Sequence, residues 1–236
     1  MGPRVVTYLR VALICLGIGL PLMAGPLLAG AWPRDPGRNF VSLAQEVPDL
    51  DRWRHGHVGL YLEQGLPGRL TVGLDLGKPT GASGRDWQAL FFLKVPFGSR
   101  GALRTAWSMG VGLTGQTGRK MGGARPIIRP GLHLGHGFDT PAGPGWLAID
   151  ASALYHTQSR QTAWKMDTTL GLRPRLGRLW YIQAQAARYP GNRPTLRLVP
   201  THVRQLTKGL SIELGVIVNT RTPRSPGLRI GTWIEF

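Results

Sequence analysis

The stretch Arg69-Leu70-Thr71-Val72-Gly73-Leu74-Asp75-Leu76 decides the fold, because its hydropathy alternates at every step. The even-numbered positions are all aliphatic, and the odd-numbered positions are charged, polar or small. Successive side chains of a β-strand point to opposite faces, so the stretch predicts a strand with one apolar and one polar face. Beyond Trp32 this period of two recurs, and no convincing period of 3.6 residues is found.

The first 31 residues have the layout of a secretory signal peptide. Arg4 and Arg10 precede an uncharged apolar run, and Ala29-Gly30-Ala31 provides small residues at the end of that run, as a cleavage site requires. A membrane-spanning helix is the alternative, but the run is interrupted by Gly17, Gly19, Pro21, Gly25 and Pro26. We therefore expect a signal peptide at 1–31 and a mature domain at 32–236.

The mature domain contains about twelve predicted strands, which is an even number. Besides 69–76, clear alternation covers 58–63, 87–97, 107–113, 147–155, 164–172, 211–218 and 228–236, and weaker candidates are 40–47, 124–138, 179–190 and 195–206. The domain offers about seventeen residues for each strand and its connection, which suits membrane strands of about ten residues with short links.

The charge balance and the single cysteine narrow the class of protein. Lys and Arg number 29 against 12 Asp and Glu, a formal net charge of +17, and 42% of residues are hydrophobic, too many for a disordered basic tail. A nucleic-acid role conflicts with the export signal and with the lack of a recognisable binding module. Cys15 lies within the predicted signal peptide, so the mature domain has no disulfide or thiolate metal cluster.

A membrane barrel fits the alternating strands better than a secreted soluble β-sandwich, which is the competing architecture. Aromatic residues stand at the ends of apolar rows, as in the interfacial girdles of membrane barrels: Trp87, Phe97, Trp107, Tyr155, Trp164, Trp180 and Phe236. The opposite faces carry charges that we expect to point into a lumen: Glu63, Asp75, Lys94, Arg129, Asp150, Lys165, Asp167, Arg173, Glu213, Arg229 and Glu235. Counted with Arg69, acids and bases balance.

The chain stops at Phe236, after aliphatic residues at alternate positions from Leu228. Here the sequence resembles Gram-negative outer-membrane β-barrel proteins, and the phrase at 65–73 is similar to hairpin turns of proteobacterial barrel proteins. The resemblance implies an all-β fold, a transmembrane antiparallel up-and-down barrel in the outer membrane. It also implies that Phe236 is the assembly signal read by the barrel-assembly machinery.

The connections predict which end of the barrel faces outward. With the N-terminus in the periplasm, links after even-numbered strands should be short turns, as at 66–68, 98–103, 176–178 and 206–209. The link at 136–145 is long for its side. In the outer loops, Arg119, Lys120, Arg221 and Arg224 are candidates to bind lipopolysaccharide phosphates, although a solvated basic rim without a ligand is an equal alternative.

Catalytic and metal motifs are weak. Asp150, Ser152 and His156 share one strand face, but such residues step along the strand by about 7 Å and cannot converge on one atom without a partner from a neighbouring strand. The histidine pairs at 55/57 and 133/136 suit loop or lumen positions better than metal binding. We expect no catalytic residue, metal or cofactor.

The sequence thus favours either a small channel for polar solutes or a structural barrel with a basic rim facing lipopolysaccharide. Acidic and basic side chains that meet across the axis would close such a pore. A lipid-acting outer-membrane enzyme and a secreted soluble β-sheet binding protein are the alternatives. The oligomeric state is left open.

Overall fold

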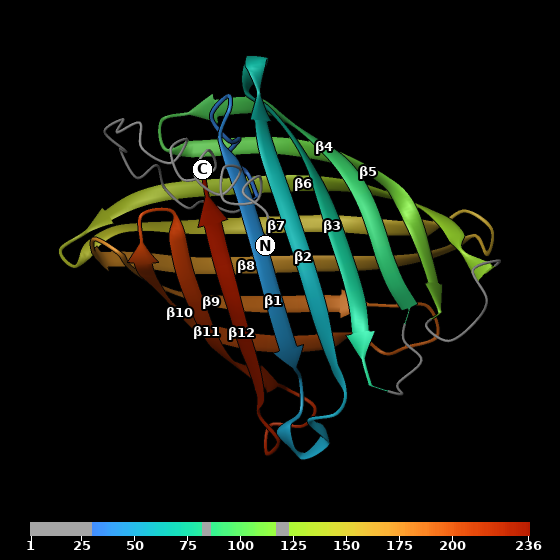
Figure 1. The fold of residues 1–236 in the computed structure, drawn as a ribbon. Coiled ribbons are helices and arrows are strands. Elements are labelled where there is room, and N and C mark those ends of the chain that lie inside the picture. Colours follow the sequence, from blue (N-terminus) through green and yellow to red (C-terminus); the bar gives the residue numbers. More distant parts are fainter. Residues whose placement is uncertain (1–29, 82–85, 117–122) are drawn as a thin grey trace, which may run out of the picture.

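The computed structural model describes residues 30–81, 86–116 and 123–236, which form a closed antiparallel barrel (Figure 1). Its strands are β1 (Asn39–Val47), β2 (Gly56–Leu66), β3 (Leu70–Thr80), β4 (Asp86–Arg100), β5 (Leu103–Gln116), β6 (Arg125–Thr140), β7 (Gly143–His156), β8 (Gln161–Arg175), β9 (Arg178–Arg188), β10 (Thr195–Thr207), β11 (Leu210–Asn219) and β12 (Gly227–Glu235). The predicted twelve-stranded, up-and-down barrel is confirmed.

The barrel closes where its first strand meets its last. β1 pairs with β12 in an antiparallel ladder from Phe40 opposite Glu235 to Val47 opposite Leu228. Every other neighbour in the barrel is consecutive in sequence. A β-sandwich would leave two sheets with edges, so the ladder between β1 and β12 rules that architecture out.

The connections alternate in length as the predicted topology requires. Turns after even-numbered strands are short: Pro67–Arg69 forms the 3-10 turn η2 between β2 and β3, with Gly68 at a φ of 75°. The loop between β1 and β2 is longer, includes the 3-10 turn η1 (Leu50–Arg52), and lies at the opposite end of the barrel in Figure 1.

The long link expected at 136–145 is wrong. β6 continues to Thr140 and pairs with β7 as far as Thr140 opposite Gly143. His136 interrupts the outward apolar row of Leu132, Leu134 and Phe138, so the sequence pattern fades before the backbone ladder does. The Thr140 hydroxyl donates to the Gly143 carbonyl at 2.7 Å and closes the tight turn.

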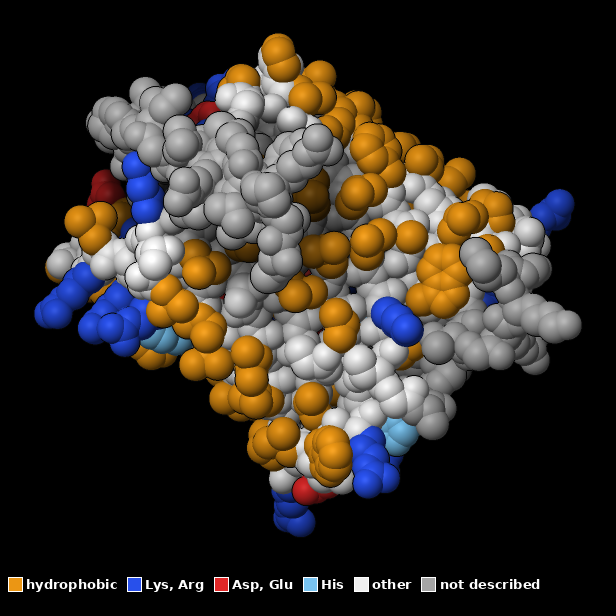
Figure 2. Space-filling model, in the orientation of Figure 1, with side chains coloured by type: hydrophobic (Ala, Val, Ile, Leu, Met, Phe, Trp, Pro, Cys, Tyr) orange, Lys and Arg blue, Asp and Glu red, His pale blue; other side chains and the backbone are white. Residues whose placement is uncertain are grey.

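The outer wall is apolar between two aromatic zones. Phe97, Trp107, Trp180 and Phe236 are exposed toward the end with the short turns, and Tyr155 and Trp164 toward the end with the long loops. Figure 2 shows hydrophobic side chains spread over the wall and Lys and Arg side chains gathered mainly near its edges. This arrangement suits a wall that faces lipid and rims that face water.

The inner face is less polar than the sequence predicts. One buried cluster consists of Leu90, Phe92 and Ile127, against which Tyr61 and Leu154 pack. A second consists of Trp146, Ala148, Leu179 and Val203 near the short turns. β4 is apolar on both faces around Leu90, so alternation there does not separate inside from outside.

Residues 30–38 enter the lumen ahead of β1. Ala31 is fully buried, and Trp32 packs on the cluster around Trp146. Gly135 makes this possible, because a Cβ at that position would lie 2.2 Å from the Trp32 ring. The segment therefore fills part of the lumen at the end of the short turns.

The predicted signal peptide at 1–31 falls almost wholly outside the described residues, and its cleavage stays a prediction. In the part of the chain that the structure describes, no helix is long and apolar enough to cross a membrane.

Candidate functional site: the polar network of the lumen

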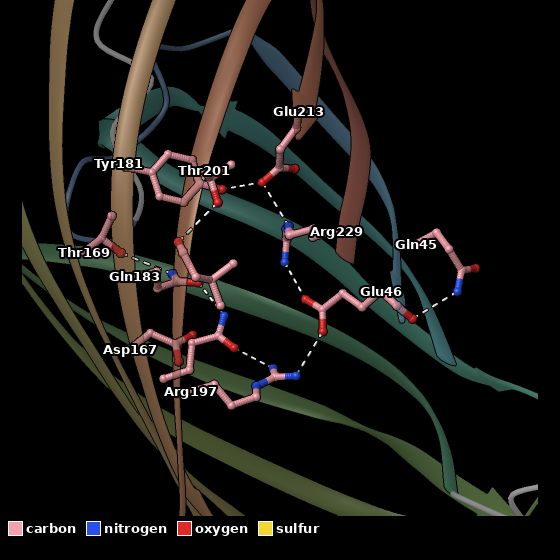
Figure 3. A network of polar contacts seen from close by, with 12 residues as sticks. Gln45, Glu46, Asp167, Thr169, Tyr181, Gln183, Arg197, Thr201, Glu213 and Arg229 are labelled. Atoms are coloured by element: carbon pink, nitrogen blue, oxygen red, sulfur yellow. Dashed lines mark hydrogen bonds and ion pairs between the residues drawn. The ribbon is translucent and has the colours of Figure 1, made fainter. Parts of the chain in front are cut away.

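Glu46 of β1 is the centre of a polar network inside the barrel (Figure 3). Its carboxylate accepts from Arg229 at 2.6 Å and from Arg197 at 3.2 Å. Arg197 comes from β10 and Arg229 from β12. Two guanidinium groups from different strands thus share one carboxylate.

The network continues from both arginines. Arg229 also donates to Glu213 at 2.9 Å, and Glu213, with no solvent exposure, accepts from the Trp233 indole at 3.0 Å and from the Tyr181 hydroxyl. On the other side, Arg197 donates to Gln185 at 2.5 Å. A chain of amide and hydroxyl contacts then runs through Gln183 to Thr169 on β8.

Some of these contacts cross the lumen instead of following its wall. The pair Arg197–Glu46 joins β10 to β1, which are three places apart around the barrel. The pair Arg129–Asp75, at 2.5 Å, joins β6 to β3, again three places apart. Such ion pairs narrow the pore, because their side chains occupy space that solutes would need.

A further network ties residues 30–38 to the wall. The Arg34 guanidinium pairs with Glu63 at 2.8 Å and with Glu235 at 3.3 Å, and the Arg34 amide donates to the Thr71 hydroxyl at 3.0 Å. Glu63 also accepts from Lys94 at 2.7 Å. Buried carboxylates need such partners, since an isolated charge away from water is costly.

The structure gives each predicted lumen charge an ionisable partner. The pairs are Glu63–Lys94, Asp75–Arg129, Asp150–His133, Lys165–Asp167, Glu213–Arg229 and Glu235–Arg34, and Arg173 interacts electrostatically with Glu235. Arg69 does not join them: it lies in the turn η2, exposed, at a φ of 63°.

Sequence reasoning missed Arg34, Glu46 and Arg197 as members of the site. Glu46 and Arg197 had a usable signal, because each stands an even number of residues from a buried, inward-facing residue of its own strand. That residue is Phe40 for Glu46 and Val199 for Arg197. Arg34 had none, because it precedes the first strand and only the folded structure brings it to Glu63.

His133 lies on the inner wall, where it was expected as a lumen histidine, and both of its ring nitrogens have polar partners. Nδ1 lies 2.7 Å from Asp150 Oδ1, and Nε2 lies 2.9 Å from Ser108 Oγ. The three residues come from β5, β6 and β7, and Ser152 and His156 are not part of the set. Among the described residues no cluster of His, Cys, Asp or Glu is arranged to hold a metal.

The outer-loop candidates are only partly described. Arg221 and Arg224 lie exposed in the loop between β11 and β12, while Arg119 and Lys120 lie outside the described residues. Arginine and lysine also gather at the opposite end, at Arg100, Arg175, Arg178, Arg204 and Lys208. The basic surplus therefore belongs to both rims.

Comparison with solved structures gives the fold a context. The KdgM porin superposes with a TM-score of 0.58 at 9% identity over 84% of this chain and 99% of that one, and KdgM in complex with disordered oligogalacturonate gives 0.60 at 8% identity over the same shares. The NanC porin gives 0.55 at 10% identity over 83% and 98%. No family model and no curated protein matches the sequence. The chain thus has the porin-type barrel fold of outer-membrane proteins.

Replacing Glu213 by Gln should destabilise the barrel, since Arg229 would lose one of its two buried carboxylates. We expect a loss of about 3 kcal/mol in the free energy of unfolding. Urea unfolding of the detergent-solubilised protein, followed by tryptophan fluorescence, measures the loss. Glu235→Gln is the matched control: its side chain is 33% exposed, so the cost should stay below about 1 kcal/mol. Equal losses would contradict the importance of the buried network.

Proposed function

We propose that this chain is an outer-membrane channel for small polar solutes, whose conductance is limited by the polar network around Glu46. The observation that carries the proposal is a porin-type barrel whose lumen ion pairs, such as Arg197–Glu46, join strands three places apart in a ring of twelve and so narrow the pore without spanning its axis. The apolar wall suits a bilayer, and the hydrogen-bonding side chains inside suit water and polar solutes.

The pairing of lumen charges argues for solutes with little net charge. Oligogalacturonate, the acidic oligosaccharide named with one KdgM structure, would favour a lumen with surplus positive charge. Here the acids of the lumen pair with bases, as in Glu63–Lys94 and Asp75–Arg129. Neither cations nor anions gain a continuous path of opposite charge, so weak ion selectivity follows.

Export and assembly complete the proposal. Cleavage after Ala31 would leave Trp32 as the first residue, inside the lumen at the periplasmic end. Phe236 suits an assembly signal, because its side chain is 63% exposed on the lipid side. Its carbonyl accepts from the Asn39 amide at 2.7 Å, so the last residue also joins the ladder between β1 and β12.

The basic outer loops are proposed to bind phosphates of lipopolysaccharide. The loop carrying Arg221 and Arg224 is tied to the β1–β2 loop by Ser225, whose hydroxyl donates to Asp49 and Asp51. The hydrogen bond from the Ser225 hydroxyl to Asp49 holds the pKa of the Asp49 carboxyl below its usual range. An ordered loop presents its guanidinium groups with less loss of conformational entropy on binding.

Removing the crossing ion pair should widen the pore. We expect the double variant Glu46→Ala with Arg197→Ala to raise single-channel conductance in planar bilayers several-fold above a small wild-type value, because both side chains leave the lumen. Lys78→Gln, on the outer side of β3, is the control and should leave conductance unchanged. If neither the wild type nor the double variant conducts, the channel is refuted and a structural barrel is left.

Neutralising the outer-loop bases should weaken lipopolysaccharide binding. We expect the variant with Arg119, Lys120, Arg221 and Arg224 all changed to Gln to retain less lipopolysaccharide after detergent extraction, since charge-assisted bonds to phosphate are lost. The control changes Arg178 and Arg204 to Gln at the other rim and should retain the wild-type amount. If the outer variant also retained that amount, the rim would be solvated without a ligand.

A further inference from the structure

Ser108, His133 and Asp150 form a hydrogen-bonded set on the inner wall. They come from the adjacent strands β5, β6 and β7, with His133 directly opposite Asp150 and Ser108 directly opposite Gly131 in the ladders. The distances are 2.9 Å from Ser108 Oγ to His133 Nε2 and 2.7 Å from His133 Nδ1 to Asp150 Oδ1. The register between neighbouring strands thus brings together a serine, a histidine and a carboxylate, which residues of one strand could not do.

When the His133 ring is neutral and Asp150 is ionised, the chemistry of the partners fixes the direction of both hydrogen bonds. An ionised carboxylate only accepts, so the N–H group at His133 Nδ1 donates a hydrogen bond to Asp150. Nε2 is then the acceptor and faces the Ser108 hydroxyl. This is the arrangement in which a histidine removes a proton from a serine while a carboxylate orients the ring.

Gly131 allows Ser108 and His133 to meet, because no larger residue fits beneath the pair. A Cβ at this position would lie 2.6 Å from Ser108 Oγ and 3.3 Å from His133 Nε2. Ser108 is neither fully buried nor fully exposed, and the His133 side chain is 13% exposed. Because Ser108 points inward and is partly exposed, a substrate carbonyl reaches its hydroxyl from the lumen.

We propose that Ser108 is the nucleophile of an acyl-transfer site that hydrolyses small polar esters inside the lumen. His133 acts as general base and acid, and Asp150 positions the ring. The proposal goes beyond the channel function and does not depend on it, because a substrate need only enter the lumen and not cross it.

The reaction balances with water as the second substrate. Ser108 Oγ attacks the ester carbonyl carbon while its proton passes to His133 Nε2; the bond to the alkoxy oxygen then breaks, and that oxygen takes the proton and leaves as an alcohol. Water attacks the acyl-serine next and gives a proton to Nε2. The bond to Oγ breaks, Ser108 regains the proton, and the carboxylic acid leaves.

The position of the site selects the substrate class. Ser108 points inward, whereas its neighbours Trp107 and Met109 are exposed on the outer wall. Acyl chains of membrane lipids lie beyond that wall and do not reach Oγ. The narrowed, polar lumen instead admits short acyl esters of polar alcohols, such as an acetylated sugar.

A fluorophosphonate probe tests the site in the full-length, membrane-extracted protein. We expect covalent labelling at Ser108, located by peptide mass spectrometry, together with hydrolysis of p-nitrophenyl acetate. Ser108→Ala should abolish both, and His133→Gln should reduce both by at least ten-fold. Ser152→Ala is the matched control: Ser152 is also on the inner wall, opposite Gly131 on β7, and its loss should leave labelling unchanged.

The positioning role of Asp150 is tested with a measurement that a folding defect would not mimic. Asp150→Asn should slow labelling of Ser108 in protein that keeps the heat-modifiable gel migration of a folded barrel, and Asp150→Glu should restore part of the rate. No label at Ser108 in folded wild type would overturn the proposal. Labelling equal at Ser152 and Ser108, or hydrolysis unchanged in Ser108→Ala, would overturn it as well.

Discussion

The antiparallel ladder between β1 and β12 is the interaction on which the rest of the structure depends. A bilayer offers no water to an unpaired backbone N–H or C=O, so a sheet can cross it only when it has no edge. Closure lets the amphipathic strands, each marginal alone, form one wall with its apolar side outward. It also fixes which residues share the interior, because inward and outward positions alternate along every strand.

Closure creates an interior that the chain must then fill. A twelve-stranded barrel is wide enough for a pore unless side chains occupy it. Here Arg197–Glu46 and Arg129–Asp75 reach across the lumen, two apolar clusters pack on the wall, and residues 30–38 enter at the end of the short turns. Among the described residues, the surplus of Lys and Arg therefore lies largely at the two rims, while the lumen charges neutralise each other.

The alternation of inward-facing and outward-facing residues along each strand explains what could be predicted from the sequence. The strand at 69–76 has unlike neighbours at every step, and its faces were assigned correctly except at Arg69, which lies in the turn before the strand. The faces of the last strand were also assigned correctly. The end of β6 was assigned to a link, because His136 interrupts the outward apolar row without disturbing the backbone pairing. Where both faces are apolar, as around Leu90, alternation gives no direction, and the inner clusters were missed.

Contacts between strands lie beyond a single sequence because they require the register. Alternation places Glu46 and Arg197 on the inner wall, but only the closed barrel shows that β10 and β1 face each other closely enough for these side chains to meet. The set of Ser108, His133 and Asp150 is the same case. Each residue belongs to a different strand, and a shift of one residue in the pairing would separate them.

The central claim is that side chains narrow the lumen without filling it: the inner wall near the long loops, where Ala187 of β9 lies, stays accessible, while Trp32 and the cluster around Trp146 take up space at the end of the short turns. The predicted mature chain has no cysteine, so single cysteines can report access. Labelling of intact cells with a membrane-impermeant maleimide should modify Ala187→Cys, inside the outer end of β9, rapidly. It should leave Ala148→Cys, fully buried in the periplasmic cluster, unmodified. Equal labelling of both positions would show that Trp32 and this cluster do not narrow the lumen, and would contradict this account.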